Sequence, residues 1–251
     1  MFEKTEYKEN GDSLRFLAKL FEYRLAHHED QAAAARFTKG KAMGNLLQRD
    51  QELDVWATVA HHERITNPEP VICEIGFAWG FSAVAILSEH PSAKYVGFDI
   101  GAQFTKDAFV ILKASFPDRL EVIWGDSSTS IRKLAEDPEK DIMCDIWIID
   151  GDHGYEGAKK DLDAIVDTAD QLTRDYPNNL VLWDDTPLDQ ESLSQTPAAI
   201  VLDRQPHGCC DGSGTVLVEA VQSGKIEFLD FGADKDERGK TVTWSMTSLK
   251  K

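Results

Sequence analysis

The stretch Val71–Ser82, VICEIGFAWGFS, decides the fold that this sequence predicts. It begins as an apolar strand, passes through small residues at Gly76, Ala78 and Gly80, and continues as a helix from about Phe81. A strand that turns tightly into a helix points backbone N–H groups and the positive end of the helix dipole at whatever lies above the turn. The stretch therefore predicts the nucleotide-cradling turn of a doubly wound α/β fold.

The spacing of the small residues distinguishes two kinds of nucleotide site. A dinucleotide fingerprint has the form Gly-x-Gly-x-x-Gly. Here Gly76, Ala78 and Gly80 alternate with larger residues, and the acid Glu74 stands two positions before the first glycine. The stretch departs from the dinucleotide pattern, and an ordinary tight turn between a strand and a helix is the alternative interpretation.

The composition is that of a soluble globular protein with one sizeable core. The chain has 251 residues, of which 42% are hydrophobic and 28% charged. A net charge of −17 opposes binding to nucleic acid and to anionic membranes, and no apolar run is long enough to span a bilayer. The polar first residues do not resemble a signal peptide. The cysteines do not have the spacing of zinc ligands. We therefore expect a cytoplasmic protein with free thiols at Cys73, Cys144, Cys209 and Cys210.

The apolar runs predict a Rossmann-like, doubly wound, seven-stranded and mostly parallel sheet with an antiparallel strand near the C-terminus. Residues 1–68 are expected to form a helical extension that acts as a lid or an oligomerisation segment, or that simply packs on the domain; residues 69–251 are expected to form one globular unit. Strands are predicted at 71–75, 94–98, 120–124, 144–149 and 179–183, then as an antiparallel pair at 215–220 and 225–231, with 240–246 as a candidate for the last.

Polar residues follow the second and third predicted strands. Asp99 ends the second strand, 25 residues beyond Glu74, where an acid that binds a ribose hydroxyl pair is expected. Asp126 and Ser127 follow the third strand, where a carboxylate and a backbone N–H suit the adenine ring. The alternatives are a surface turn for Asp99 and an N-cap at Ser127 or Ser128.

Three acids follow the fourth and fifth predicted strands, namely Asp150, Asp184 and Asp185. Neighbouring parallel strands bring their carboxyl ends to one edge, so these carboxylates converge and need a neutralising cation. Oxygen ligands favour Mg²⁺, Ca²⁺ or Mn²⁺ over zinc. His153, on the same edge, is a candidate base. A structural histidine, and a capping role for Asp185, are the alternatives.

The order of these motifs resembles class I S-adenosylmethionine (SAM) methyltransferases, specifically the cation-dependent O-methyltransferases that act on catechols, sugars and macrolides. The segments that carry the resemblance are EIGFAWGFS, FDIG, WGDSS, IIDGDHGYEGAKKDL and LVLWDDT. It implies that SAM is bound by Glu74, Gly76, Ala78, Gly80, Ser82, Asp99, Asp126 and Ser127, and the metal by Asp150, Asp184 and Asp185. His153 and Asp185 are like the sugar-modifying relatives, which weakens a catechol assignment.

The resemblance implies methyl transfer from SAM to a hydroxyl of a small molecule, with the cation binding the acceptor oxygen and His153 taking its proton. Lys41 and Met43 fall in the segment that covers the substrate in such enzymes. The chain is expected to bind neither nucleic acid nor membrane, and the helical extension would suit a homodimer or higher homo-oligomer. Alternatives are a metal-free N-methyltransferase, a SAM-binding protein without transfer activity, and an NAD-type oxidoreductase.

Overall fold

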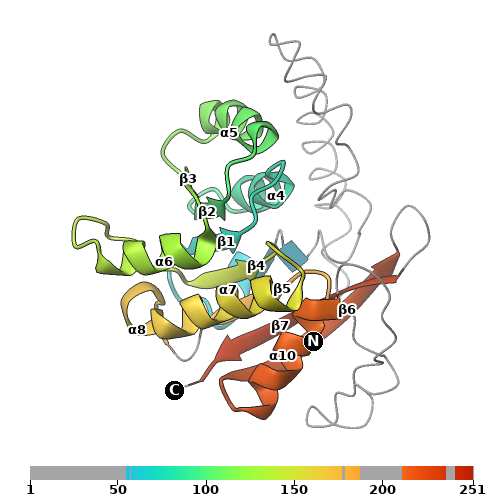
Figure 1. Ribbon diagram of the computed structural model, residues 1–251. Helices are drawn as coiled ribbons and strands as arrows, with labels where there is room; N and C mark the ends of the chain where they lie inside the picture. The colour runs from blue at the N-terminus through green and yellow to red at the C-terminus, as the bar shows by residue number, and fades with distance from the viewer. Residues whose placement is uncertain (1–54, 57, 177–178, 187–210, 236–240, 251) are drawn as a thin grey trace.

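The computed structural model describes residues 55–56, 58–176, 179–186, 211–235 and 241–250, drawn in colour in Figure 1. These residues form a seven-stranded sheet in the order β3-β2-β1-β4-β5-β7-β6. The strands are β1 (Val71–Ile75), β2 (Lys94–Asp99), β3 (Leu120–Trp124), β4 (Ile146–Ile149), β5 (Leu180–Trp183), β6 (Ile226–Lys235) and β7 (Thr241–Leu249). Most of the helical extension predicted over residues 1–68, including Lys41 and Met43, lies outside the described residues.

The parallel part of the sheet, formed by β3, β2, β1, β4 and β5, brings five strand ends to one edge. Strand β1 lies between β2 and β4, with Ile75 opposite Phe98 on one side and Ile149 on the other. Strand β5 continues the parallel order, whereas β7 pairs with β5 and with β6 in the antiparallel sense. The predicted fold class is therefore confirmed. The acid that ends β2 and the acids that follow β4 and β5 share the carboxyl edge.

Helices cover both faces of the sheet (Figure 1). The apolar side chains of β4 point alternately to the two faces, so both faces need a covering layer. Ile146 and Ile148 belong to one core cluster, and Trp147 and Ile149 belong to the other. One face carries α4 (Phe81–Glu89), α5 (Gln103–Ser115) and the short 3₁₀ helix η2 (Val59–His61). The opposite face carries α6 (Ser127–Glu136), α7 (Tyr155–Asp167), α8 (Ala169–Leu172) and α10 (Asp211–Gln222). Both faces of β4 are buried, as is usual for parallel strands.

The strand predicted at 215–220 is wrong, because these residues belong to α10. Thr215, Val216 and Val218 favour strands when considered alone, since β-branched residues have low helix propensity. Val216, Leu217 and Ala220 are nevertheless buried in the core cluster that contains α7, and α10 packs on α7. Tertiary packing therefore overrides the local preference. Strand β6 pairs instead with β7, which the sequence had suggested as the last strand.

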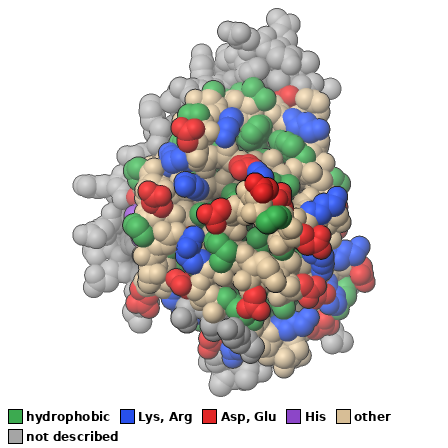
Figure 2. Space-filling model, turned by 90° about the vertical axis from the view of Figure 1, so that its left-hand side faces the viewer, with side chains coloured by type: hydrophobic (Ala, Val, Ile, Leu, Met, Phe, Trp, Pro, Cys, Tyr) green, Lys and Arg blue, Asp and Glu red, His purple; other side chains and the backbone are tan. Residues whose placement is uncertain are grey.

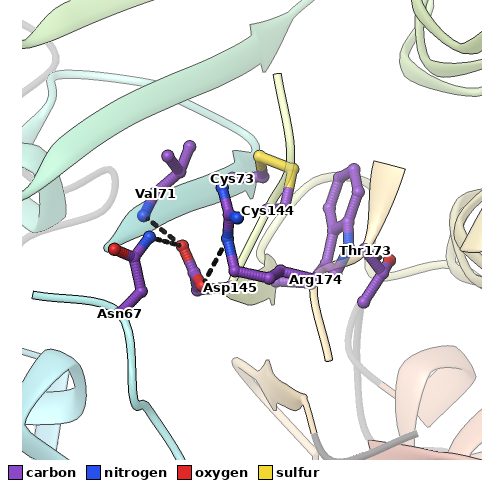
Figure 3. Close-up of a disulfide and its surroundings, with 8 residues drawn as sticks. Asn67, Val71, Cys73, Cys144, Asp145, Thr173 and Arg174 are labelled. Carbon is purple, nitrogen blue, oxygen red and sulfur yellow. Dashed lines mark hydrogen bonds and ion pairs between the residues drawn. A yellow bond between two sulfur atoms is a disulfide. The ribbon is translucent and has the colours of Figure 1, made fainter. Parts of the chain in front are cut away.

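The prediction that the cysteines are free thiols is also wrong for Cys73 and Cys144, which form a disulfide (Figure 3). Cys73 lies on β1 and Cys144 stands just before β4, and their Cα atoms are 5.7 Å apart, within the range that a disulfide requires. Both side chains are fully buried. The pairing depends on the register of two strands 71 residues apart in the sequence, which composition does not reveal. Cys209 and Cys210 lie outside the described residues.

The surface combines charges of both signs. The face in Figure 2 carries acidic and basic side chains interspersed with hydrophobic ones, and acidic side chains gather near its centre.

Among the helices that the structure describes, each is too short or too polar to cross a membrane.

Candidate active site

The turn between β1 and α4 has the backbone geometry that its small residues predict. Gly76, Ala78 and Gly80 all have positive φ, at 95°, 44° and 74°, and Gly80 is the N-cap of α4. A Cβ atom on Gly76 would lie 2.0 Å from the carbonyl oxygen of Asp150, so no other residue fits without displacing that backbone. The turn therefore packs directly on the loop that follows β4.

Glu74 lies fully buried at the base of this turn. Its Oε2 accepts a hydrogen bond of 2.6 Å from the hydroxyl of Ser82, whereas Oε1 is buried without a partner among the described residues. Burial raises the pKa of Glu74 well above its usual range, and the negative charges of Asp150, Asp184 and Asp99 raise it further. A buried polar oxygen without a partner is costly, which makes it a candidate contact for a ligand.

Asp99 binds the same turn from β2. Its Oδ2 accepts a hydrogen bond of 3.1 Å from the N–H of Ala78, and its Oδ1 one of 2.7 Å from the N–H of Gly101. Asp99 therefore fixes the backbone of Ala78, which otherwise adopts a conformation unusual for a residue with a side chain. Each carboxylate oxygen has a second acceptor site, so these bonds leave capacity for ribose hydroxyls.

Asp126 is the N-cap of α6. The two residues that the sequence suggested for this role, Ser127 and Ser128, lie within the helix instead. Oδ1 of Asp126 accepts from the N–H of Thr129 at 2.9 Å and from the hydroxyl of Ser128 at 2.8 Å. These hydrogen bonds lower the pKa of Asp126. Ser127 is the first residue of α6 and donates its hydroxyl to Asp161 on α7, a partner that the sequence did not indicate.

The carboxyl ends of β4 and β5 bring Asp150, Asp184 and His153 together. One ligand atom from each of the three lies within 4.8 Å of the others. Strands β4 and β5 are parallel neighbours, and the N–H of Asp184 donates to the carbonyl of Ile149 at 3.1 Å. The predicted convergence of Asp150 and Asp184 is thus present in the structure. Divalent cations such as Mg²⁺ and Ca²⁺ bind between carboxylate oxygens that lie close together in this way.

Two close carboxyl groups in this position cannot both be charged without cost. The pKa of Asp150 is raised to about 8, first by burial and then by Asp184, while the hydrogen bond and charge of His153 act in the opposite direction. A quarter of the Asp150 side chain nevertheless remains exposed. The carboxyl group is therefore both accessible and electrostatically unfavourable, which a bound cation would relieve.

The carboxyl group of Asp185 pairs with His153, while its backbone N–H donates to Oδ1 of Asp184 at 2.7 Å. Oδ2 of Asp185 lies 3.2 Å from Nδ1 of His153, while Nε2 of the same ring lies 3.1 Å from Oδ1 of Asp150. Asp185 has a φ of 46°, an uncommon value for a residue other than glycine. The imidazole is thus oriented by one carboxyl group on each side.

The N-terminal end of α10 closes this group of residues, a contact absent from the sequence interpretation. The N–H of Ser213 donates to the carbonyl of His153 at 3.2 Å, and its hydroxyl donates to the carbonyl of Asp185 at 2.7 Å. A Cβ on Gly212 would lie 2.0 Å from the backbone nitrogen of Tyr155. The sequence did not indicate these contacts, because residues 215–220 of this helix were predicted to form a strand.

A family model described as "Methyltransferase domain" matches residues 73–186. This range begins within β1 and ends after β5, and it contains every residue predicted to bind SAM or metal. This part of the chain is therefore similar to methyltransferase domains, in agreement with the resemblance in its sequence. The comparison with curated proteins found no match.

Solved structures share the fold at low sequence identity. The O-methyltransferase TomG from Streptomyces achromogenes, involved in tomaymycin synthesis and solved with SAM, is 15% identical over 100% of both chains, with a TM-score of 0.59. The O-methyltransferase from Bacillus cereus, in complex with SAH, is also 15% identical, over 94% of this chain and 99% of its own, with a TM-score of 0.58. The SAH-bound Podospora anserina methyltransferase PaMTH1 is 16% identical over 100% and 99%, with a TM-score of 0.53. This chain thus has the fold of these methyltransferases.

Proposed function

We propose that this protein transfers the methyl group of SAM to a hydroxyl of a small molecule, with a divalent cation on the acceptor oxygen and His153 as the base. The observation that carries the proposal is the concentration of acids at the carboxyl edge. Burial and mutual repulsion raise the pKa of both Glu74 and Asp150, and Asp184 contributes to each shift. Such a site favours cationic ligands, and both SAM, a sulfonium, and a divalent metal are cations.

The same concentration of charge argues against the NAD-type alternative. A dinucleotide places an anionic pyrophosphate over the first turn. Here the turn at Gly76 packs on Asp150, above the buried Glu74. The glycine spacing of a dinucleotide site is also missing from Val71–Ser82.

The residues of the turn fit SAM. Glu74 offers a buried oxygen that has no partner within the described part of the chain, which suits a donor group on the cofactor. Asp99 retains acceptor capacity for ribose hydroxyls, and Asp126 with the N–H of Ser127 stands at the start of α6, where we place the adenine. Gly76, Ala78, Gly80 and Ser82 complete the proposed SAM site.

The donor set also fits a hard cation. We propose Asp150, Asp184 and Asp185 as ligands of Mg²⁺, or of Ca²⁺ or Mn²⁺, since their oxygens suit these ions better than zinc. Such a cation, when bound, stabilises negative charge on an acceptor oxygen and lowers the pKa of its hydroxyl. His153 lies among the same groups, 3.1 Å from Asp150.

The neighbours of His153 suit a proton acceptor. If Nδ1–H donates to Asp185, Nε2 on the side of Asp150 is the nitrogen that accepts the proton of the acceptor hydroxyl. Asp185 then stabilises the imidazolium that forms. Ser213 supports this arrangement through the backbone carbonyls of both residues.

The acceptor class is open to direct measurement. The purified full chain is incubated with methyl-labelled SAM, MgCl₂ or EDTA, and panels of catechols, glycosides and hydroxylated natural products. TomG acts in tomaymycin synthesis, which supports including natural products. We expect label transfer to an oxygen in the presence of Mg²⁺ and at least a hundredfold less in EDTA, roughly the scale of metal-assisted catalysis.

The controls separate the alternatives. Asp150→Asn should abolish Mg²⁺-dependent transfer while SAM still binds, whereas Asp170→Asn, at an exposed acid on α8, should change neither. Transfer to nitrogen in EDTA would indicate the metal-free N-methyltransferase. SAM binding without any transfer would indicate a binding protein, and NAD binding without SAM binding would overturn the proposal.

A further inference from the structure

Asp161 is a buried acid that the proposed chemistry does not use. It lies on α7 with only 4% of its surface exposed, among the apolar residues Ala158, Leu162 and Ile165 of the same helix. Its Oδ1 accepts a hydrogen bond from the hydroxyl of Ser127, the first residue of α6. Burial raises the pKa of Asp161 to about 6, although the Ser127 hydrogen bond lowers it.

The second oxygen of Asp161 faces the loop that follows β4. A Cβ on Gly151 would lie 3.1 Å from Oδ2 of Asp161 and 2.9 Å from Cγ2 of Ile75. Gly151 is the residue directly after Asp150. One carboxyl group thus lies between the start of α6, where we place the adenine, and the loop that carries the proposed metal ligands.

A carboxyl group in this position is costly as a packing element. Burying it opposes its charge, and among the residues that the structure describes no cation forms an ion pair with it. An apolar residue at this buried position would avoid this cost. A buried polar contact of this kind specifies geometry, because only one arrangement of the two helices satisfies it.

We propose that Asp161 is a positioning residue for adenine recognition, which holds the Ser127 hydroxyl and thereby fixes the backbone N–H of Ser127 toward the base. The inference rests on the proposed SAM-binding function. Asp161 itself does not contact the cofactor. Its role is to hold the first turn of α6 in a fixed position relative to the loop after Asp150.

The test measures base selectivity, which a general loss of stability would not change. The probes are S-adenosylhomocysteine and S-inosylhomocysteine, which differ in the base. Adenine N1 accepts a hydrogen bond, whereas hypoxanthine N1 carries a hydrogen and opposes a donor. A well-placed N–H should therefore make the wild-type protein prefer the adenine ligand by roughly tenfold or more in Kd, measured by calorimetry.

Two variants remove the same contact from its two ends. Asp161→Ala and Ser127→Ala should each reduce the preference at least about threefold, leaving the part that Asp126 contributes through the amino group of adenine, and the double variant should lose no more than either single one. Asp161→Asn keeps an acceptor oxygen for the Ser127 hydroxyl and should retain the wild-type preference. Asp163→Ala is the matched control, because Asp163 is an acid on the same helix that pairs with Lys159 and Lys225 instead.

The outcomes are separable. A folded Asp161→Ala or Ser127→Ala protein that keeps the full preference overturns the inference alone. If Asp161→Ala does not fold, the half-buried Ser127→Ala decides the question. A wild-type protein that binds S-adenosylhomocysteine without preference for adenine also overturns the inference while leaving the proposed function in place. A wild-type protein that binds neither ligand overturns the proposed function and the inference with it.

Discussion

Strand β4 is flanked by two aspartates whose surroundings differ completely. Asp145, before the strand, is 4% exposed and accepts from the N–H of Val71 at 2.7 Å and from Asn67 at 3.0 Å, with Arg174 at 3.1 Å (Figure 3). Asp150, after the strand, meets Asp184 and has its pKa raised to about 8.

The difference separates a structural acid from a functional one. Donors and a cation satisfy Asp145 within the fold, so its charge stabilises the connection between β1 and β4. The carboxyl edge leaves Asp150 beside a second acid, and such an arrangement is retained where a ligand supplies the missing charge. Substitutions at the two ends of β4 should therefore have opposite effects on activity and stability.

The largest effect is expected on turnover. Asp150→Ala should reduce Mg²⁺-dependent methyl transfer by roughly a thousandfold, because it removes a proposed cation ligand and a partner of His153. SAM affinity should remain within a few fold, as measured by calorimetry. Turnover above a tenth of the wild-type value would contradict the proposed role of Asp150.

The next effect is a pH dependence of stability in EDTA. The folded pKa of Asp150, about 8, exceeds its usual value of 3.8, so the native state binds the proton more tightly. The contribution of Asp150 is most favourable below about pH 4 and is lost as the pH rises toward 8. Asp150→Asn removes this loss, so its unfolding free energy at pH 8.5 should exceed the wild-type value by up to about 4 kcal/mol, with little difference at pH 4.5.

Urea denaturation at both pH values checks this difference. Saturating Mg²⁺ should reduce the advantage of Asp150→Asn at pH 8.5, because only the wild-type protein gains a bound cation. An advantage of equal size at both pH values would show that Asp150 does not titrate as described.

At the other end of β4, Asp145→Ala should lower the unfolding free energy by about 3 kcal/mol. The substitution leaves Arg174, Asn67 and the N–H of Val71 without their acceptor. Turnover per folded molecule should be unchanged. Asp141→Ala, at an exposed acid near the same edge, is the matched control and should shift stability by less than about 0.5 kcal/mol.

The smallest effect is expected for Arg174→Met, which keeps the apolar stem but removes the charge. The Arg174 side chain is 42% exposed, so solvent screens its ion pair with Asp145, and the loss should be about 1 kcal/mol and smaller in high salt. Thermal denaturation at two salt concentrations measures it. A drop in turnover would show that the two ends of β4 are coupled. It would contradict the division into a structural acid, Asp145, and a functional acid, Asp150.

The sequence predicted the carboxyl edge well because its determinants are local. Each acid there directly follows an apolar run, and parallel pairing of neighbouring strands then places Asp99, Asp150 and Asp184 at one edge. Gly76, Ala78 and Gly80 were likewise informative, because positive φ restricts the residues that fit.

The features that the sequence missed depend on contacts distant along the chain. Asp161 meets Ser127 across 34 residues because two helices pack together, and Asp145 pairs with Asn67 across 78 residues. The helix α10 forms despite β-branched residues because it packs on α7. Periodicity describes one segment at a time, so it indicates which face of each element is buried but not which partner the face meets.

The contact between Gly76 and the carbonyl of Asp150 has a consequence for any redesign of this protein. With no space for a single additional carbon atom between them, the two loops behave mechanically as one part. An altered cofactor specificity obtained by reshaping the first loop would displace the acid that follows β4. Transplanting either loop onto another scaffold would therefore require transplanting both.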